Sequence, residues 1–315
     1  MPMSSKKPNP CLSVLDVGHG SAAVLRDEGG VVVFDAGKGA HVERYLDSIG
    51  VTKVEAMFLS HADVDHIGGA VTLLLNPKVK VRAVFLNPDP TKDTEVFMQL
   101  CVALCEAEKR SGTHAEPSLT TNTVVSRKGA NIEVLYPPAT TALAGVGGRN
   151  QHGKRNTSNS LSAAIRITGA TNVSVLLGGD VEFDCVDEWK RQGLTPSATA
   201  LIFPHHGGLP VNVDESEAAL FAHEITKLVT PDTIVFSIHR SLHLNPRDKI
   251  LSAVLKASKK VRFACTQLPD RFHALVGKDA AWCLHRHPSG KGIVEGTVEF
   301  TFVRDGLKIQ FRDSP

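Results

Sequence analysis

The 315-residue sequence predicts an α/β fold, and two patterns support this prediction. Short apolar runs alternate with stretches of helical periodicity along most of the chain, as is typical of sheets flanked by helices. Several of the apolar runs end in Gly, Asp or His, and such sheets collect their active sites at strand ends. Hydrophobic residues make up 42% and charged residues 22%, which is ordinary globular usage and favours neither disorder nor a fibrous architecture.

The first half of the sequence predicts strands and helices in alternation. Runs of Val, Leu, Ile and Phe indicate strands, and apolar residues three or four positions apart indicate helices. The expected elements are two strands within 12–25, a strand over 31–34, a helix over 41–49, a strand over 54–59, a helix over 70–75 that follows Gly68 and Gly69, a strand over 79–86, a helix over 94–110 and a hairpin over 123–135.

The second half repeats the pattern after a long loop. Residues 137–158 are rich in Gly, Thr and Asn, and a loop of this length indicates a functional or mobile segment. Beyond it we expect strands over 162–168, 173–177, 200–203 and 233–238, and helices near 181–192 and over 246–258.

The charge balance argues against a protein that coats DNA. The formal net charge is +2, with 35 Lys and Arg against 33 Asp and Glu, so no global basic field is present. A local basic groove is compatible with this balance, and Arg149, Lys154 and Arg155 supply cations in the long loop. An enzyme that acts on nucleic acid is therefore still allowed.

The sequence indicates a cytoplasmic protein without a membrane partner. The polar, proline-rich segment 1–10 lacks the apolar core of a signal peptide, and we expect it to be a disordered tail. No apolar run approaches the roughly 20 residues of a membrane span. Six scattered cysteines fit reduced thiols better than a disulfide framework.

The most informative segment follows the strand predicted over 54–59. It contains His61, Asp63, Asp65 and His66 within six positions. On a loop that leaves a buried strand, such a cluster is costly unless a cation neutralises it. Imidazole and carboxylate suit zinc, manganese or iron. The alternative is a surface loop whose charges are solvated, but similar groups recur at later strand ends, where Asp180, His205 and His206 follow apolar runs.

The segment 61–66, HADVDH, resembles the HxHxDH signature of metallo-β-lactamase-fold hydrolases, with Asp in place of the second His. Other motifs occur in the order typical of the ComEC-like branch, which is similar to the predicted nuclease domain of a competence protein. They are LDVGHGSA (15–22), FDAG (34–37), NSL (159–161), LGGD (177–180) and FPHHGG (203–208). The resemblance implies an αββα sandwich of two mixed sheets flanked by helices.

The resemblance also implies a centre of two divalent metal ions, Zn or Mn, with Mg as a further option. His61 and Asp63 would bind one ion, Asp65 and His66 the other, Asp180 would bridge both, and His205 would complete the second site. Supporting positions behind or beside the ligands would be Asp16, Asp35, Asn159 and His206. Catalytic positions would be Asp65, His19, His243 and Asn245.

Two departures from the branch leave alternatives open. Where the branch often has Gly-His-Pro, this chain has the segment 241–246, so the imidazole is either replaced by Asn245 or supplied by His243. For the third ligand of the first metal, the chain offers Asn159 in the motif position and His152 in the long loop.

We expect three segments: a tail over 1–10, a hydrolase domain over 11–264, and a C-terminal extension over 265–315 with closing strands. Cysteine and histidine residues in the extension raise the hypothesis of an additional structural zinc, with Cys265, His273, Cys283 and His285 as ligands. The alternative is that they are unrelated core or surface residues.

The function expected is that of a phosphodiesterase or nuclease that uses metal-activated hydroxide, with nucleic acid or another phosphodiester as substrate. One alternative is a hydrolase of small carbonyl compounds, such as a lactone or thioester. Another is an effector of a bacterial antiphage operon that is silent until a sensor or operon partner protein binds.

Overall fold

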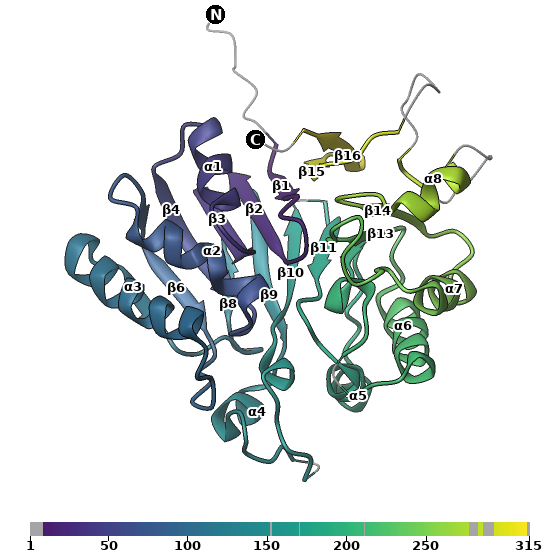
Figure 1. The fold of residues 1–315 in the computed structure, drawn as a ribbon, viewed down its shortest axis with the longest axis horizontal. Coiled ribbons are helices and arrows are strands. Elements are labelled where there is room, and N and C mark those ends of the chain that lie inside the picture. The colour runs from purple at the N-terminus through teal and green to yellow at the C-terminus, as the bar shows by residue number, and fades with distance from the viewer. Residues whose placement is uncertain are drawn as a thin grey trace, which may run out of the picture.

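Two mixed β-sheets are stacked face to face, with helices on their outer faces (Figure 1). The computed structural model describes residues 9–151, 153–169, 171–210, 212–276, 283–285 and 293–313. Residues 1–8, most of the expected tail, and His152 lie outside this part of the chain. The prediction of an αββα sandwich is confirmed.

The first sheet has the strand order β16-β15-β1-β2-β3-β4-β6-β7, with β5 beside β4. Strands β3, β4, β6 and β7 are parallel neighbours, and the other pairs along this order are antiparallel. Its strands are β1 (Cys11–Val14), β2 (Ala22–Asp27), β3 (Gly30–Ala36), β4 (Lys53–Leu59), β5 (Lys80–Val81), β6 (Ala83–Leu86), β7 (His114–Glu116), β15 (Thr297–Val303) and β16 (Gly306–Arg312).

The second sheet has the order β14-β13-β12-β11-β10-β9-β8. Strands β11 to β14 are parallel, and β8 to β11 are antiparallel. Its strands are β8 (Val124–Ser126), β9 (Ala130–Tyr136), β10 (Ala164–Gly169), β11 (Ser174–Leu177), β12 (Ala200–Ile202), β13 (Thr233–Phe236) and β14 (Arg262–Cys265).

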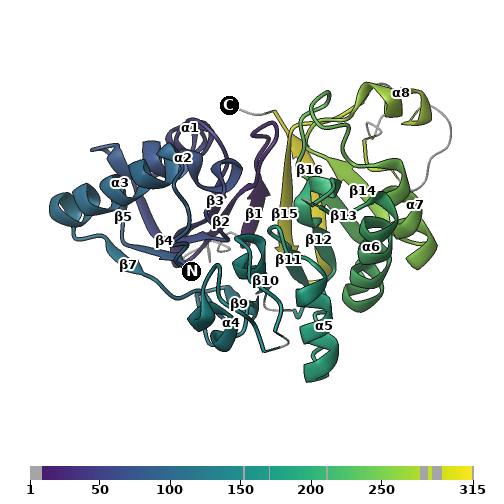
Figure 2. The ribbon, with the colours of Figure 1, turned by 60° about the horizontal axis from the view of Figure 1, so that its bottom comes forward.

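Helices flank the two sheets on opposite sides (Figures 1 and 2). Helices α1 (His41–Ser48), α2 (Val64–Leu75) and α3 (Glu95–Ser111) flank the first sheet, and α5 (Phe183–Gln192), α6 (Glu215–Val229) and α7 (Asp248–Ala257) flank the second. Shorter helices are α4 (Ala139–Ala144) and α8 (Asp270–Val276), with 3-10 turns η1 (Asn159–Leu161) and η2 (Pro204–Gly207).

Three apolar clusters separate these four layers. Between the sheets, alternate residues of facing strands meet, among them Leu12, Phe34, Phe58 and Ile167. A second cluster lies between the first sheet and its helices, and a third, around Trp189, lies between the second sheet and its helices. The central strands therefore bury both faces, which explains their nearly continuous apolar runs in the sequence, whereas the strands β7, β8 and β16 at the sheet edges are partly exposed.

Helix α2 begins earlier than the sequence predicted. It starts at Val64, directly after Asp63, so Gly68 and Gly69 lie inside it. A side chain at Gly69 would come within 2.3 Å of the Ala36 carbonyl oxygen, so the glycine permits the helix to approach the end of β3. Packing has overridden the usual reluctance of glycine to stand in a helix.

The C-terminal strands belong to the first sheet. Strand β15 pairs with β1, with Leu12 opposite Phe300, and β16 covers β15 from outside. The expected boundary between residues 264 and 265 falls within β14, so the second sheet also crosses it. Within the described residues, no helix is long and apolar enough to cross a membrane.

Candidate metal centre

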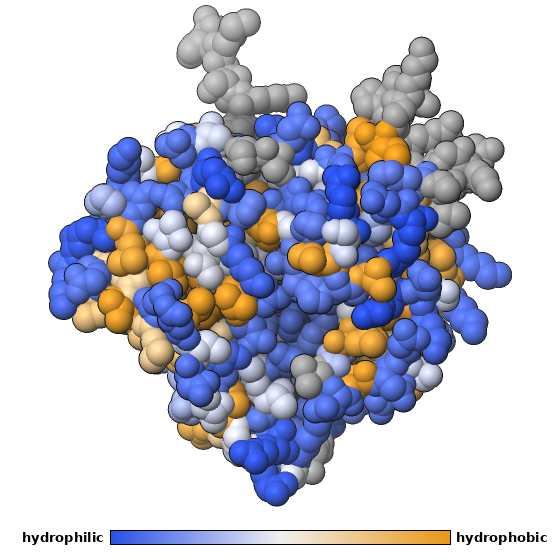
Figure 3. Space-filling view, viewed as in Figure 1, coloured by the Kyte–Doolittle hydropathy of each residue, from blue (hydrophilic) through white to orange (hydrophobic). Residues whose placement is uncertain are grey.

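The polar residues that follow the central strands converge between the two sheets. Asp35 lies near the end of β3, His61 follows β4, Asp180 follows β11, and His205 and His206 follow β12. Figure 3 shows a hollow lined by hydrophilic residues near the middle of this face of the molecule. The ends of strands that are far apart in the sequence therefore lie close together, as the sequence predicted.

Asp180 stands at the centre of a ring of imidazoles. Its Oδ1 lies 3.3 Å from His66 Nε2 and 3.9 Å from His206 Nε2. Its Oδ2 lies 3.4 Å from His205 Nδ1 and 3.8 Å from His61 Nε2. One carboxylate therefore faces four histidines, two on each oxygen.

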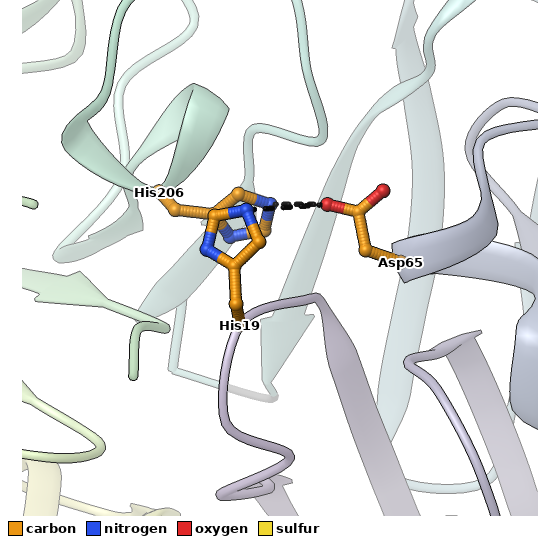
Figure 4. Close-up of side chains that lie close together, drawn as sticks. All are labelled: His19, Asp65 and His206. Carbon is orange, nitrogen blue, oxygen red and sulfur yellow. Dashed lines mark ion pairs between the residues drawn. The ribbon is translucent and has the colours of Figure 1, made fainter. Parts of the chain in front are cut away.

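The second carboxylate of the centre is Asp65, in the first turn of α2. Its Oδ2 lies 3.5 Å from His206 Nε2 and 3.6 Å from His19 Nε2, and the three side chains point toward one another (Figure 4). Their donor atoms lie within 4.8 Å of one another, as do those of His61, His66 and Asp180. Both groups thus contain imidazole and carboxylate donors of the kind that bind divalent metal ions.

The places of His205 and His206 differ from those expected. His206, expected to support the ligands, lies with Asp65, while His205 faces the Asp180 oxygen that His61 also faces. Both residues have left-handed backbone conformations, with φ of 51° and 55°, so their side chains point in directions that no regular periodicity describes. The sequence alone could not order them.

Asp35 orients one ligand from behind. It is buried, also has a left-handed φ of 51°, and accepts hydrogen bonds from the Ser60 N–H at 2.7 Å and the Ser60 hydroxyl at 2.9 Å. Its Oδ2 lies 2.7 Å from His66 Nδ1, which leaves Nε2 of that ring directed at Asp180. This is the support role that the resemblance implied for Asp35.

A lysine side chain approaches the centre from a loop that the sequence analysis did not single out. The Lys92 ammonium contacts Asp63 Oδ1, and the Ser158 hydroxyl lies 3.3 Å from the same oxygen. The other oxygen, Oδ2, lies 3.6 Å from His61 Nε2. Asp63 is more exposed than the other carboxylates, and one of its oxygens is already engaged.

The remaining expected positions lie around the centre. Asp16 accepts hydrogen bonds from the Gly18 N–H and the Gln267 amide, so it holds the loop that carries His19. Asn159 donates to Glu182 Oε1 at 3.0 Å, beside His205. This bond is compatible with a supporting position for Asn159, and both that role and the alternative of a metal ligand stay predictions.

A pocket of about 200 Å³ opens onto the centre. Its lining includes Asp65, Asp180, His205 and His206. His243 and Asn245, the two alternatives for the branch's missing imidazole, also line it, as does Arg247, which sequence reasoning missed. The His243 ring lies 4.3 Å from that of His19, measured between centroids, so both candidates reach the pocket.

The pKa values of the centre indicate which of its side chains are charged. Burial opposes ionisation of Asp180, yet His205 and His66 hold the pKa of its carboxyl well below the ordinary value. Burial likewise disfavours a charged His66, yet Asp180 and Asp35 raise the pKa of that imidazole. Burial and the neighbouring His206 lower the pKa of His19 to about 4, so this ring is neutral at pH 7.

The donor set fits divalent metal ions. Buried atoms of the centre lack a hydrogen-bond partner, namely Nε2 of His61, His66, His205 and His206, and Oδ1 of Asp180. In three of these rings the other nitrogen, Nδ1, has a hydrogen-bond partner. Nδ1 of His61 lies near the hydroxyls of Ser60 and Ser162. Nδ1 of His66 contacts Asp35, and Nδ1 of His206 contacts the Ser237 carbonyl. One fixed and one free nitrogen is the arrangement of a metal-binding histidine.

The C-terminal Cys and His residues are arranged differently from the zinc hypothesis. His285 accepts a hydrogen bond from the Cys265 N–H at 2.7 Å, and its Nδ1 bonds the Val294 carbonyl at 2.5 Å, so neither nitrogen is free. Among the described residues, Cys265, His273, Cys283 and His285 form no group of three ligand atoms. His285 here joins β14 to the C-terminal segment.

Comparison with known proteins agrees with this architecture. The model of the metallo-beta-lactamase superfamily matches residues 15–94. Ribonuclease Z from two strains of Treponema pallidum is 40% identical over 57 residues, and these are 18% of this chain and 18% of each relative. The chain thus matches less than a fifth of the length of these curated relatives.

Solved structures resemble a larger part of the chain. The metallo-beta-lactamase fold protein YhfI from Bacillus subtilis has a TM-score of 0.51 at 16% identity, over 81% of this chain and 97% of that one. Igni18, a metallo hydrolase from Ignicoccus hospitalis, has a TM-score of 0.47 at 14% identity, over 93% and 100% of the two chains. From its layers, its strand order and its likeness to YhfI, the chain has the metallo-β-lactamase fold.

Proposed function

We propose that this protein is a metal-dependent phosphodiesterase, in the first instance a nuclease. The observation that carries the proposal is the environment of Asp180, whose two oxygens face separate pairs of imidazoles. A carboxylate so placed can bridge two cations a few ångströms apart. Nε2 of His61, His66 and His206 face it without a hydrogen-bond partner and would supply further ligands, while His205 faces it through Nδ1.

We infer that the candidate ligands divide between the two sides of Asp180. On the Oδ2 side are His61, His205 and the free oxygen of Asp63; on the Oδ1 side are His66, His206 and Asp65. His205 would then be the third ligand of the first ion, for which the sequence offered Asn159 or His152. Carboxylates in both sets favour manganese or magnesium beside zinc.

When bound, two divalent ions would lower the pKa of water and stabilise the attacking and leaving oxygens of an in-line displacement. The protein's own groups would position the substrate. Asn245 is 3% exposed and its Oδ1 has no partner, so it can accept a hydrogen bond from a bound molecule. His243, exposed at the rim, can give a proton to the leaving oxygen.

The comparisons support the same class of reaction. The Treponema pallidum relative, 40% identical over 57 residues, is called ribonuclease Z, a name that indicates cleavage of the phosphodiester bonds of RNA. The motifs around residues 15–22 and 203–208 support placement in the ComEC-like branch. We also place the protein in the cytoplasm, in line with its six free cysteines.

The test is hydrolysis by the purified protein in the presence of manganese, zinc or magnesium. We expect cleavage of single-stranded DNA, RNA or bis(p-nitrophenyl) phosphate, and a loss of at least about 10³-fold in Asp65→Asn and Asp180→Asn. Asp47→Asn, an exposed carboxylate on α1, should retain full activity. Hydrolysis of a lactone or thioester with no phosphodiester cleaved under any of the metals would overturn the proposal.

A further inference from the structure

Arg247 stands in the wall of the pocket that faces the candidate metal centre. It precedes α7, and its backbone N–H donates to the Gly207 carbonyl at 2.9 Å. Gly207 ends the turn that carries His205 and His206. The backbone of Arg247 is thus fixed directly to the segment that holds two candidate ligands.

The guanidinium of Arg247 has no counter-charge among the described residues. Other arginines of the protein pair with carboxylates, as Arg127 does with Asp27 and Arg240 with Glu295. Arg247 is half-buried, and its Nε is shielded from solvent without a hydrogen-bond partner. A guanidinium nitrogen that is shielded from solvent and has no acceptor is costly unless a ligand supplies one.

Asn245 also lines this pocket. Its side chain is buried, with only 3% of the residue exposed and Oδ1 unpartnered, and it packs against Gly208. A Cβ at Gly208 would lie 2.8 Å from Nδ2 of Asn245, so this glycine leaves room for the amide. Asn245 and Arg247, two positions apart in the chain, therefore bring an amide and a cation to the lining of the same pocket.

The size of the pocket limits what can fill it. Its volume of about 200 Å³ is below the roughly 300–1,000 Å³ of sites that enclose a drug-sized ligand. A phosphoryl group fits such a space, while the rest of a larger substrate would extend into solvent. A planar guanidinium matches the oxygens of phosphate with two parallel hydrogen bonds.

We propose that Arg247 is the residue that selects anionic substrates: its guanidinium binds the non-bridging oxygens of the phosphoryl group. This inference rests on the proposed function and deepens it. A neutral lactone or thioester offers no such charge, so Arg247 separates phosphodiesters from the carbonyl compounds that the same fold could hydrolyse.

The experiment measures binding and turnover separately in Arg247→Gln, Arg247→Lys and the control Lys249→Gln. Lys249 is an exposed cation two residues further along, paired with Glu215. Isothermal titration with inorganic phosphate, on protein whose metal content is measured, should show at least about tenfold weaker binding in Arg247→Gln. Arg247→Lys should recover part of the affinity, and Lys249→Gln should bind as the wild type does.

With bis(p-nitrophenyl) phosphate, KM should rise about tenfold or more in Arg247→Gln while kcat changes less, as for a group that binds ground and transition state alike. Wild-type affinity for phosphate in Arg247→Gln at equal metal content overturns the inference, and so does a wild-type protein that does not bind phosphate. If Arg247→Gln fails to fold, undiminished phosphate affinity in Arg247→Lys overturns the bidentate role. Weakened phosphate binding in a protein that cleaves no phosphodiester would instead refute the proposed function and leave the anion site in place.

Discussion

Asp35 combines a strained backbone with three hydrogen bonds at the back of the centre. The bonds from Ser60 and the contact with His66 Nδ1 keep the free nitrogen of that ring directed at Asp180. Asp35→Asn keeps the shape and the tolerance of a left-handed φ but removes the charge that orients the imidazole. We expect metal affinity to fall about 10- to 100-fold, measured by competition with a chromogenic chelator.

The matched control for this variant is Asp27→Asn. Asp27 is another carboxylate shielded from solvent, and it binds Arg127 through both oxygens. Its loss should destabilise the fold while leaving metal affinity as in the wild type. Equal metal affinities in the two variants would show that Asp35 has no particular role at the centre.

The sequence located the residues on regular strand ends and missed those on irregular loops. His61, Asp65 and Asp180 follow apolar strands, so their convergence could be predicted. The order of His205 and His206 depends on two left-handed residues in succession, and Lys92 and Arg247 reach the site from loops without any motif. Such placement is set by tertiary packing, which local patterns do not encode.

Among the elements, helix α6 begins with a capping motif that is visible in the sequence, although the sequence analysis did not predict this helix. Asp214 caps it, accepting from the N–H groups of Ser216 at 2.6 Å and Glu217 at 3.0 Å, while Glu217 reaches back to the Asp214 N–H. An acid followed three positions later by Glu is a start signal for a helix. By contrast, no local sequence signal marks the start of α2 at Val64, and the glycines inside this helix favoured a later start.

Removing this cap should weaken the protein in a pH-dependent way. The backbone bonds from Glu217 and Ser216 lower the pKa of Asp214 in the folded state. A lowered folded-state pKa gives stability that is present above the unfolded pKa of about 4 and is lost as pH falls through the folded value. Asp214→Ala should thus lower Tm by about 2 °C at pH 7 and by less below pH 4.

Asp214→Asn provides the control, since asparagine caps helices about as well as aspartate without a charge. Its Tm should stay near that of the wild type at pH 7. A deficit of Asp214→Ala that is unchanged between pH 7 and pH 3 in thermal scans would show that the carboxylate charge is irrelevant to the cap.

At the scale of the whole molecule, the fold class was predictable and the strand order was not. Alternation of strands and helices indicated an α/β protein, and the HADVDH motif indicated the sandwich. The pairing of β1 with β15, which joins residues as distant in sequence as Leu12 and Phe300, follows from packing between distant segments. This pairing makes the C-terminal strands part of the first sheet.

The candidate ligands come from both sheets, so metal binding should stabilise the molecule as a whole. His61 and Asp65 follow β4 of the first sheet, whereas Asp180 and His206 follow β11 and β12 of the second. A ligand that binds only the folded state at 100 times its Kd adds about 2.7 kcal/mol to the free energy of unfolding. Manganese or zinc added to chelator-treated protein should therefore raise Tm, and EDTA should reverse the gain. Asp180→Asn removes the carboxylate shared by both sides, and its Tm should respond far less to metal. A wild-type Tm that is the same with EDTA and with either metal would contradict a centre that joins the two sheets.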